Sequence, residues 1–66
     1  MNIYKVTVEY SKQSGRDIVL AKSVYENVRM CLVAENYIRI LEKGKLEIKK
    51  ISYERIWSVK IEREIG

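Results

Sequence analysis

Apolar and polar residues alternate along most of this chain, and the first segment shows the pattern most plainly. Residues 2–10 carry apolar side chains at four even positions, Tyr4, Val6, Val8 and Tyr10. A period of two residues predicts a half-buried β-strand, because successive side chains point to opposite faces. Polar residues then surround Gly15 over positions 11–16, and β-branched and aliphatic residues return at 17–24. We expect a hairpin whose loop of about six residues is the most mobile part of the molecule.

The segment from residue 24 to residue 41 contains neither Gly nor Pro, so a helix and a strand both have to be considered. Helical spacing of apolar residues breaks at the charged Glu35 after two turns, whereas alternate spacing continues through Val28, Met30, Leu32 and Ala34. We therefore predict extended backbone that turns at Glu35 and Asn36 and returns through residues 37–41. The alternative is an α+β fold in which a helix at about residues 21–35 packs on a four-stranded sheet.

Two interruptions divide the C-terminal part of the chain. Gly44 can adopt positive φ between two alternating segments, and Leu46 and Ile48 after it are expected to point inward. Residues 52–55 interrupt the pattern over one helical turn, which the Ser52 side chain can cap. The last strand follows, with three apolar residues on one face, Trp57, Val59 and Ile61. We assign Trp57 to the core and expect its replacement by Ala to cost roughly 3 to 5 kcal/mol.

Together these elements predict an all-β fold in a single small domain that spans residues 1–66. The expected architecture is a six-stranded antiparallel meander, barrel-like or strongly bent, with one short helical turn near residues 52–55. The expected core consists of Tyr4, Val6, Val8, Ile18, Leu20, Val28, Met30, Leu32, Ile38, Ile40, Leu46, Ile48, Trp57, Val59 and Ile61.

The composition of the chain lacks several residue types on which catalysis commonly depends. The 66 residues include no His and a single Cys, which excludes an internal disulfide, His metal ligands and a His general base. The acidic residues are scattered, and the three glycines are too far apart to form a phosphate-binding loop. Without a His to activate it, Cys31 is expected to be a small buried apolar residue. We therefore expect a protein that is not an enzyme and uses no cofactor, metal or small-molecule substrate.

Size and hydropathy bear on location and assembly. No apolar run approaches the ~18 to 20 residues of a membrane span, and the first residues lack the pattern of a signal peptide. We therefore expect a cytoplasmic protein with no membrane partner. At 47% hydrophobic residues the chain should fold, but so small a domain buries little of its surface. Association with further copies, as a homo-oligomer, would stabilise it.

The second face of the predicted middle hairpin is unusually apolar. With Ile38 and Ile40 in the core, alternation turns Cys31 and several neighbours to the opposite face. Tyr and Arg are enriched at protein interfaces, so we interpret this face as a docking surface for another protein or a second copy. Its residues are Arg29, Val33, Tyr37, Arg39 and Leu41. In the alternative, the chain itself covers this face. The preferred function is an inhibitor or adaptor, of the kind encoded by mobile elements or phages, that acts through protein–protein interaction.

Charge supports one alternative function. The chain has 13 Lys and Arg against 9 Asp and Glu, a formal net charge of +4. Basic side chains neutralise phosphates and aromatic rings stack on bases, so a small basic β-domain can bind nucleic acid. The candidate contacts are Lys43, Lys45, Lys49, Lys50 and Tyr53. Glu42, Glu47 and Glu54 lie among them and weaken any basic field. Nucleic-acid binding predicts an affinity that falls steeply with salt, whereas docking of a protein predicts weak salt dependence.

Overall fold

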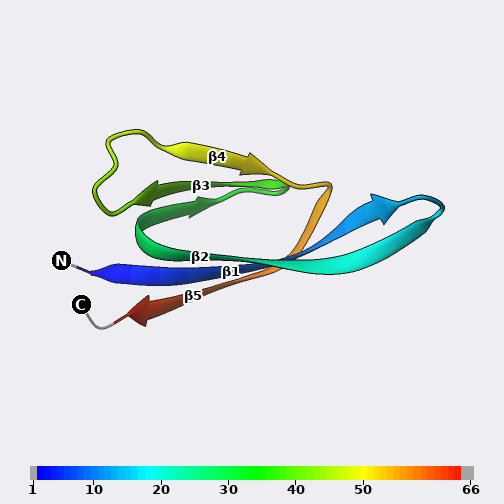
Figure 1. Cartoon of the computed structure of the whole chain (residues 1–66), viewed down its shortest axis with the longest axis horizontal. Coiled ribbons are helices and arrows are strands. Elements are labelled where there is room, and N and C mark those ends of the chain that lie inside the picture. Colours follow the sequence, from blue (N-terminus) through cyan, green and yellow to red (C-terminus); the bar gives the residue numbers. More distant parts are fainter. Residues whose placement is uncertain (1, 65–66) are drawn as a thin grey trace.

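The computed structural model describes residues 2–64 and shows one antiparallel sheet of five strands (Figure 1). The strands are β1 (Ile3–Ser14), β2 (Asp17–Val33), β3 (Tyr37–Glu42), β4 (Lys49–Ser52) and β5 (Arg55–Glu64). The described residues contain no helix, and hence none that is long and apolar enough to cross a membrane. The all-β prediction is confirmed, and the alternative with a helix at about residues 21–35 is wrong.

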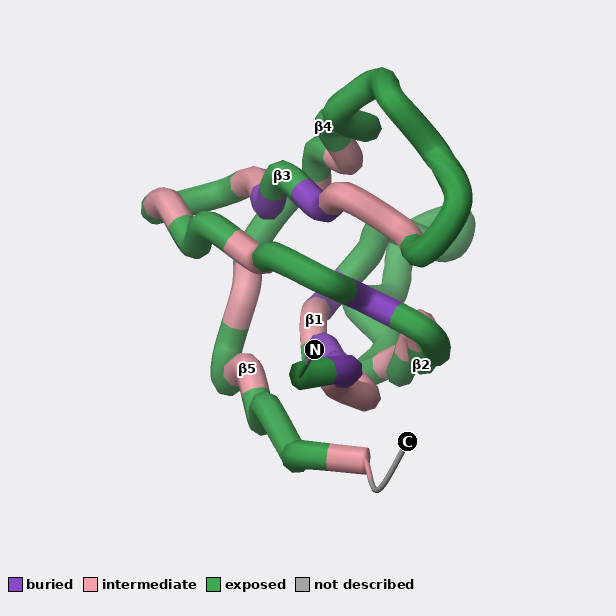
Figure 2. The backbone as a smooth tube through the Cα atoms, turned by 90° about the vertical axis from the view of Figure 1, so that its left-hand side faces the viewer, coloured by how far each residue is buried: buried purple, intermediate pink, exposed green. Residues whose placement is uncertain are grey.

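The sheet is bent because its central strand changes direction. β2 has 17 residues, more than either neighbour, and Asn27 in its middle adopts a φ of 57°. Relative to β1, β2 gains one extra residue between Tyr25 and Val28, and relative to β3 it gains another between Val28 and Met30. Such bulges increase the local twist and bend the strand. The bend carries β3 and β4 over β1 and β5, so that two layers form (Figure 2).

The core lies between these two layers. Its fully buried side chains come from β1, β2 and β3, and they are Val6, Val8, Val28, Ile38 and Ile40. All five were predicted as core residues from the alternating pattern. Partly buried side chains pack around them, namely Tyr4, Tyr10, Tyr25, Cys31, Ile51, Tyr53, Ile56 and Val59. β-Branched residues dominate the centre because their stiff side chains pack well on a pleated surface.

The strand order is β4-β3-β2-β1-β5, which leaves β4 and β5 as the two edges of an open sheet. The barrel-like closure considered from the sequence therefore does not occur over residues 2–64. Only Tyr53 and Glu54 join the two edge strands, and the backbone N–H of Tyr53 donates to the carbonyl of Asn36 at 2.8 Å. The expected helical turn near residues 52–55 is absent from the described chain, because Ser52 ends β4 and Arg55 begins β5 at this corner.

The projecting end of the β1–β2 hairpin, which we call the ribbon, comprises residues 12–20. Ser11 is the last residue of β1 that pairs with β5, so beyond it β1 and β2 pair only with each other. Figure 1 shows this end extending away from the other strands, along the 44 Å length of the molecule. Gly15 and Arg16 form a tight two-residue turn, in which Gly15 adopts a φ of 61°. The loop of about six residues expected here is wrong, because the strands pair up to Ser14 and Asp17.

The sixth predicted strand is also missing from the described residues. The chain between β3 and β4 is a loop over residues 43–48, in which Gly44 adopts a φ of 82°. Leu46 is 98% exposed and Ile48 is about half exposed, so neither points into the core as expected. The reason is geometric: β4 begins to pair with β3 only at Lys49, opposite Ile40.

Bulges also reverse the faces predicted for part of β2. The extra residue before Met30 places Cys31 opposite Ile40 and Val33 opposite Ile38, on the inner face. Met30 and Leu32 consequently lie on the outer face, and both are exposed. The extended conformation of this segment was predicted correctly, but the assignment of its two faces was wrong beyond Val28, because simple alternation takes no account of an inserted residue.

A second bulge moves Trp57 out of the core. In β5, Ile56 lies opposite Tyr10 and Ser58 lies opposite Glu9, so that Trp57 between them has no partner in β1. Ile56 takes the inward position, and Trp57 is 54% exposed. The prediction of a core Trp57 is therefore wrong. The ribbon residues Ile18 and Leu20 are likewise exposed rather than buried, as is Ile61 at the sheet edge.

Candidate protein-binding surface

Three apolar side chains and one arginine from two strands form an exposed area on the outer face, which we call the Trp57 patch. They are Ile18 and Leu20 of β2 and Arg55 and Trp57 of β5. Leu20 and Arg55 both lie opposite Ser11, on either side of β1. Ile18 precedes Leu20 by two residues and lies on the same face. Ile18 is 71% exposed and Leu20 is 77% exposed. The patch is exposed because it lies on the outer face of the sheet, whereas the layer formed by β3 and β4 covers the inner face.

The Trp57 ring is held in place by a charged neighbour. The guanidinium carbon of Arg55 lies 4.0 Å from the centroid of the indole ring. A cation over the face of Trp is attracted by the ring quadrupole, by about 0.5 to 1 kcal/mol at an exposed site. Trp and Arg are the residues that most often dominate the energy of protein interfaces. The pair therefore presents a large, half-exposed aromatic surface with a cation packed on it.

A hollow of about 290 Å³ opens beside this ring. Glu9, Tyr10, Leu20, Ala21 and Trp57 line it, and most of its wall is apolar. A volume of this size can hold a single large side chain. The Trp57 indole and the Glu9 side chain are among the groups that line it. The geometry suits an aromatic or aliphatic side chain of another chain.

The corner between β4 and β5 fastens the base of the ribbon. The Glu54 carboxylate accepts a hydrogen bond of 3.0 Å from the backbone N–H of Gln13, at the point where β5 no longer pairs with β1. On the opposite face, the rings of Tyr10 and Tyr53 pack at 4.5 Å between centroids. The Trp57 patch therefore lies over a braced part of the sheet.

Tyr53 belongs to a group of tyrosines on the inner face. Its hydroxyl lies 2.7 Å from the hydroxyl of Tyr25, and the Ser23 hydroxyl donates to the hydroxyl of Tyr10 at 3.4 Å. Burial, followed by the hydrogen bond with Tyr25, raises the pKa of Tyr53 well above its ordinary value. The sequence proposed Tyr53 as a nucleic-acid contact, but its side chain packs against the core cluster.

Three of the five residues expected at the protein interface share the outer face of β3. They are Tyr37, Arg39 and Leu41, and the exposed Met30 and Leu32 of β2 lie opposite Leu41 and Arg39. The other two are placed differently. Val33 faces the inner side, opposite Ile38, and Arg29 is the exposed residue inserted at the bulge between Val28 and Met30.

One residue of the nucleic-acid set joins that face. Lys50 lies opposite Arg39 in β4, and its Nζ atom is 4.4 Å from the centroid of the Tyr37 ring. The guanidinium carbon of Arg39 is 5.5 Å from the same ring. We call Tyr37, Arg39 and Lys50 the Tyr37 cluster. It combines one aromatic ring with two exposed cations.

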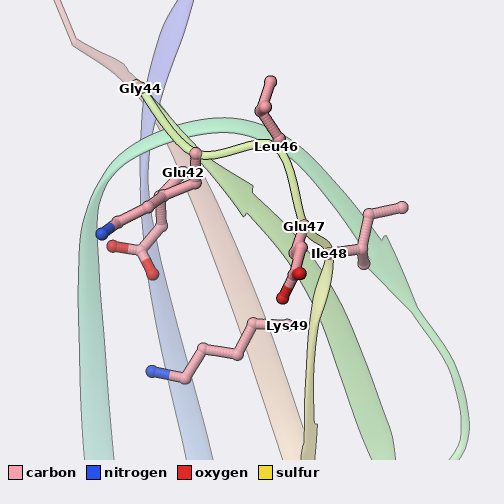
Figure 3. Close-up of a pocket in the computed structure, with 7 residues that line it drawn as sticks. Glu42, Gly44, Leu46, Glu47, Ile48 and Lys49 are labelled. Carbon is pink, nitrogen blue, oxygen red and sulfur yellow. The ribbon is translucent and has the colours of Figure 1, made fainter.

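The other lysines that were expected to contact nucleic acid lie in or next to the β3–β4 loop. Lys45 and Lys49 line a wide hollow of about 710 Å³ together with Glu42 and Glu47, and Lys43 lies in the same exposed loop. Figure 3 shows the Leu46 and Ile48 side chains directed away from these charged groups. Carboxylates and ammonium groups alternate on the walls of the hollow, so it presents no field of one sign to a ligand.

Sequence reasoning missed the Trp57 patch because it assigned Ile18, Leu20 and Trp57 to the core. One signal was available: residues 18–21 are four consecutive apolar residues, so they place apolar side chains on both faces of the strand, and only one face of a small antiparallel sheet packs on its core. No protein-family model, curated protein or solved structure matches this chain. Among residues 2–64, no group of three or more Cys, Asp and Glu side chains is arranged to hold a metal ion.

Proposed function

We propose that the protein is a non-enzymatic binding protein that docks another protein chain on its Trp57 patch. The observation that carries this proposal is the exposure of Ile18, Leu20 and Trp57 on one face, beside a hollow lined mostly by apolar atoms. Contiguous apolar surface is costly to leave in water and commonly marks an interaction site. An inhibitor or adaptor that acts by covering part of its target needs only such a surface.

The patch also defines the chemistry of the partner. Its centre suits a large apolar side chain that enters between Leu20 and Trp57. Arg55 offers guanidinium N–H donors next to the ring, which favours a partner carboxylate at the border of the contact. Burial of the apolar centre would supply most of the affinity, so we expect binding to depend weakly on salt.

The test uses two substitutions of the same kind in the same strand. Leu20→Asp places a charge in the Trp57 patch, and Leu32→Asp places one on the outer face near the Tyr37 cluster; Leu32 is 53% exposed. The wild-type protein is immobilised, a partner is recovered from an extract of the host, and its affinity for purified variants is then measured. We expect Leu20→Asp to lose binding by at least about tenfold and Leu32→Asp to keep it. Loss with Leu32→Asp alone would contradict this choice of surface.

Nucleic-acid binding is the second candidate, and the Tyr37 cluster favours it. Residues 29–50 contain six Lys and Arg against three Glu, so this segment carries +3 of the formal net charge of +4. The test is a titration with a single-stranded oligonucleotide at low and moderate salt. Tight binding that weakens steeply with salt and is lost in Arg39→Ala and Lys50→Ala would move this candidate to first place. Binding that is weak and unaffected by these substitutions would remove it.

A further inference from the structure

The outer edge of β5 has no strand beside it anywhere in the described chain. β5 is the last strand in the sheet order and pairs with β1 on one side only. Figure 1 shows it along the border of the molecule, with no other strand beyond it. Such an edge presents a row of unpaired N–H and C=O groups and can template pairing with another chain. At ten residues β5 offers a much longer edge than the four residues of β4 at the opposite side.

The regular part of β5 is symmetric about Ile61. After the bulge at Trp57, residues 58–64 pair with β1 without interruption. When two antiparallel copies of this segment are aligned with Ile61 opposite Ile61, every one of these residues has a partner. Ser58 then faces Glu64, Val59 faces Arg63 and Lys60 faces Glu62. A two-fold axis through Ile61 thus uses the whole regular segment.

Charge selects this alignment over its neighbours. Lys60 and Glu62 lie on the same outer face, and Nζ of Lys60 is 3.9 Å from Oε1 of Glu62. With Ile61 at the axis, each Lys60 lies opposite a Glu62 of the second copy, and four charges of alternating sign form a square. An axis through Lys60 would place lysine opposite lysine, and an axis through Glu62 would place glutamate opposite glutamate. Opposite charges across a strand pair stabilise it, whereas like charges destabilise it.

The same alignment covers an exposed apolar side chain. Ile61 lies on the inner face opposite Val6, yet it is 47% exposed because no strand lies beyond it. In the paired arrangement, Ile61 of the second copy comes to lie directly against it. Polar groups on the outer face and an isoleucine pair on the inner face thus favour the same register.

We propose that two copies of this protein associate by antiparallel pairing of their β5 strands about Ile61, which joins two five-stranded sheets into one. The interface is isologous: each copy contributes the same segment, and it closes after two copies. Trp57 lies outside the paired residues, so the dimer carries two copies of the Trp57 patch.

Two single substitutions test the charge pairing. Lys60→Glu places four carboxylates at the square, and Glu62→Lys places four ammonium groups there. We expect each variant alone to self-associate on the order of tenfold to a hundredfold more weakly than the wild type, because two attractive pairs become repulsive. An equimolar mixture of the two restores opposite charges across the axis and should form a mixed dimer. Lys22→Glu, on the outer face of β2, makes the same change in net charge as Lys60→Glu and is its matched control.

Sedimentation velocity over a range of concentrations gives the outcome. We expect the wild type and Lys22→Glu to approach twice the monomer mass, each edge variant to stay a monomer, and the mixture to dimerise. Circular dichroism of each variant checks that the sheet is intact. If an edge variant is unfolded, Lys60→Ala and Glu62→Ala are measured in its place, and we expect both to dimerise more weakly than the wild type. A wild type that is monomeric throughout, or edge variants that dimerise as the wild type does, would overturn the proposal. So would multimers larger than two, which this symmetry does not allow.

Discussion

Val28 and Leu20 lie in the same strand and are both aliphatic, yet Val28 is fully buried and Leu20 is 77% exposed. Val28 lies at the bend of β2, where β3 folds over β1 and encloses it. Leu20 lies at the base of the ribbon on the outer face, which faces away from the second layer. The comparison shows that an aliphatic side chain is buried only where a second layer covers the face on which it lies. The bent half of the molecule therefore encloses the core, whereas the half that contains the ribbon exposes apolar side chains to water.

The largest expected effect belongs to the packed half. Ile38→Ala removes most of a fully buried side chain and leaves a cavity between the layers, so we expect a loss of about 2 to 5 kcal/mol in the free energy of unfolding. For so small a domain this approaches its whole stability. Leu20→Ala is the matched change in the ribbon and should alter stability by less than about 1 kcal/mol. Equilibrium urea unfolding of both variants measures the difference. Equal losses in the free energy of unfolding would contradict the assignment of Ile38 to the core and Leu20 to the surface.

The bend that separates the halves gives the next effect. Asn27 adopts a φ of 57°, which a β-branched side chain tolerates poorly. We expect Asn27→Val to lower stability by about 1 to 2 kcal/mol, and Asn27→Gly, which adopts this conformation freely, to leave it nearly unchanged. Thermal unfolding monitored by circular dichroism compares the two. If both variants lost stability alike, the side chain of Asn27 rather than its backbone conformation would maintain the bend.

The tyrosine group that links the halves predicts a pH dependence. Burial and the hydrogen bond with Tyr25 raise the pKa of Tyr53 in the folded protein above its ordinary value of about 10. Above that pH the unfolded chain therefore binds fewer protons than the folded chain, and stability falls as pH rises. We expect Tyr53→Phe to cost about 1 kcal/mol at neutral pH, because it loses the 2.7 Å hydrogen bond. The alkaline loss of stability should be smaller in the variant. Unfolding measured from pH 8 upward checks both results.

The smallest effect on stability is expected at Trp57. Its ring is about half exposed and packs against Arg55, so Trp57→Ala should cost about 0.5 to 1 kcal/mol rather than the roughly 3 to 5 kcal/mol of a core tryptophan. Val59→Ala, which truncates an inward side chain of the same strand, serves as a comparison and should cost more. A drop in melting temperature of more than a few degrees for Trp57→Ala would show that this side chain is buried in the core, contrary to this account.

The two halves also differ in how well the sequence predicts them. Alternation identified Val6, Val8, Ile38 and Ile40 because neither β1 nor β3 contains an inserted residue. It identified Val28 because the alternation was counted from Val28 onward, beyond the bulge at Asn27. It failed for the outer face because an inserted residue shifts every later side chain to the opposite side, and nothing in the local pattern marks where a partner strand will end. Cation–aromatic pairs such as that of Arg55 and Trp57 depend on the register and could not be foreseen.

The most direct test of the Trp57 patch is quenching of tryptophan fluorescence by acrylamide, since Trp57 is the only tryptophan in the chain. We predict that the indole in the folded protein is readily quenched, at a rate of the same order as in the urea-unfolded chain, because about half of its surface is in contact with water. A folded protein whose fluorescence resists quenching until the chain unfolds would contradict an exposed Trp57, and with it the proposed binding surface.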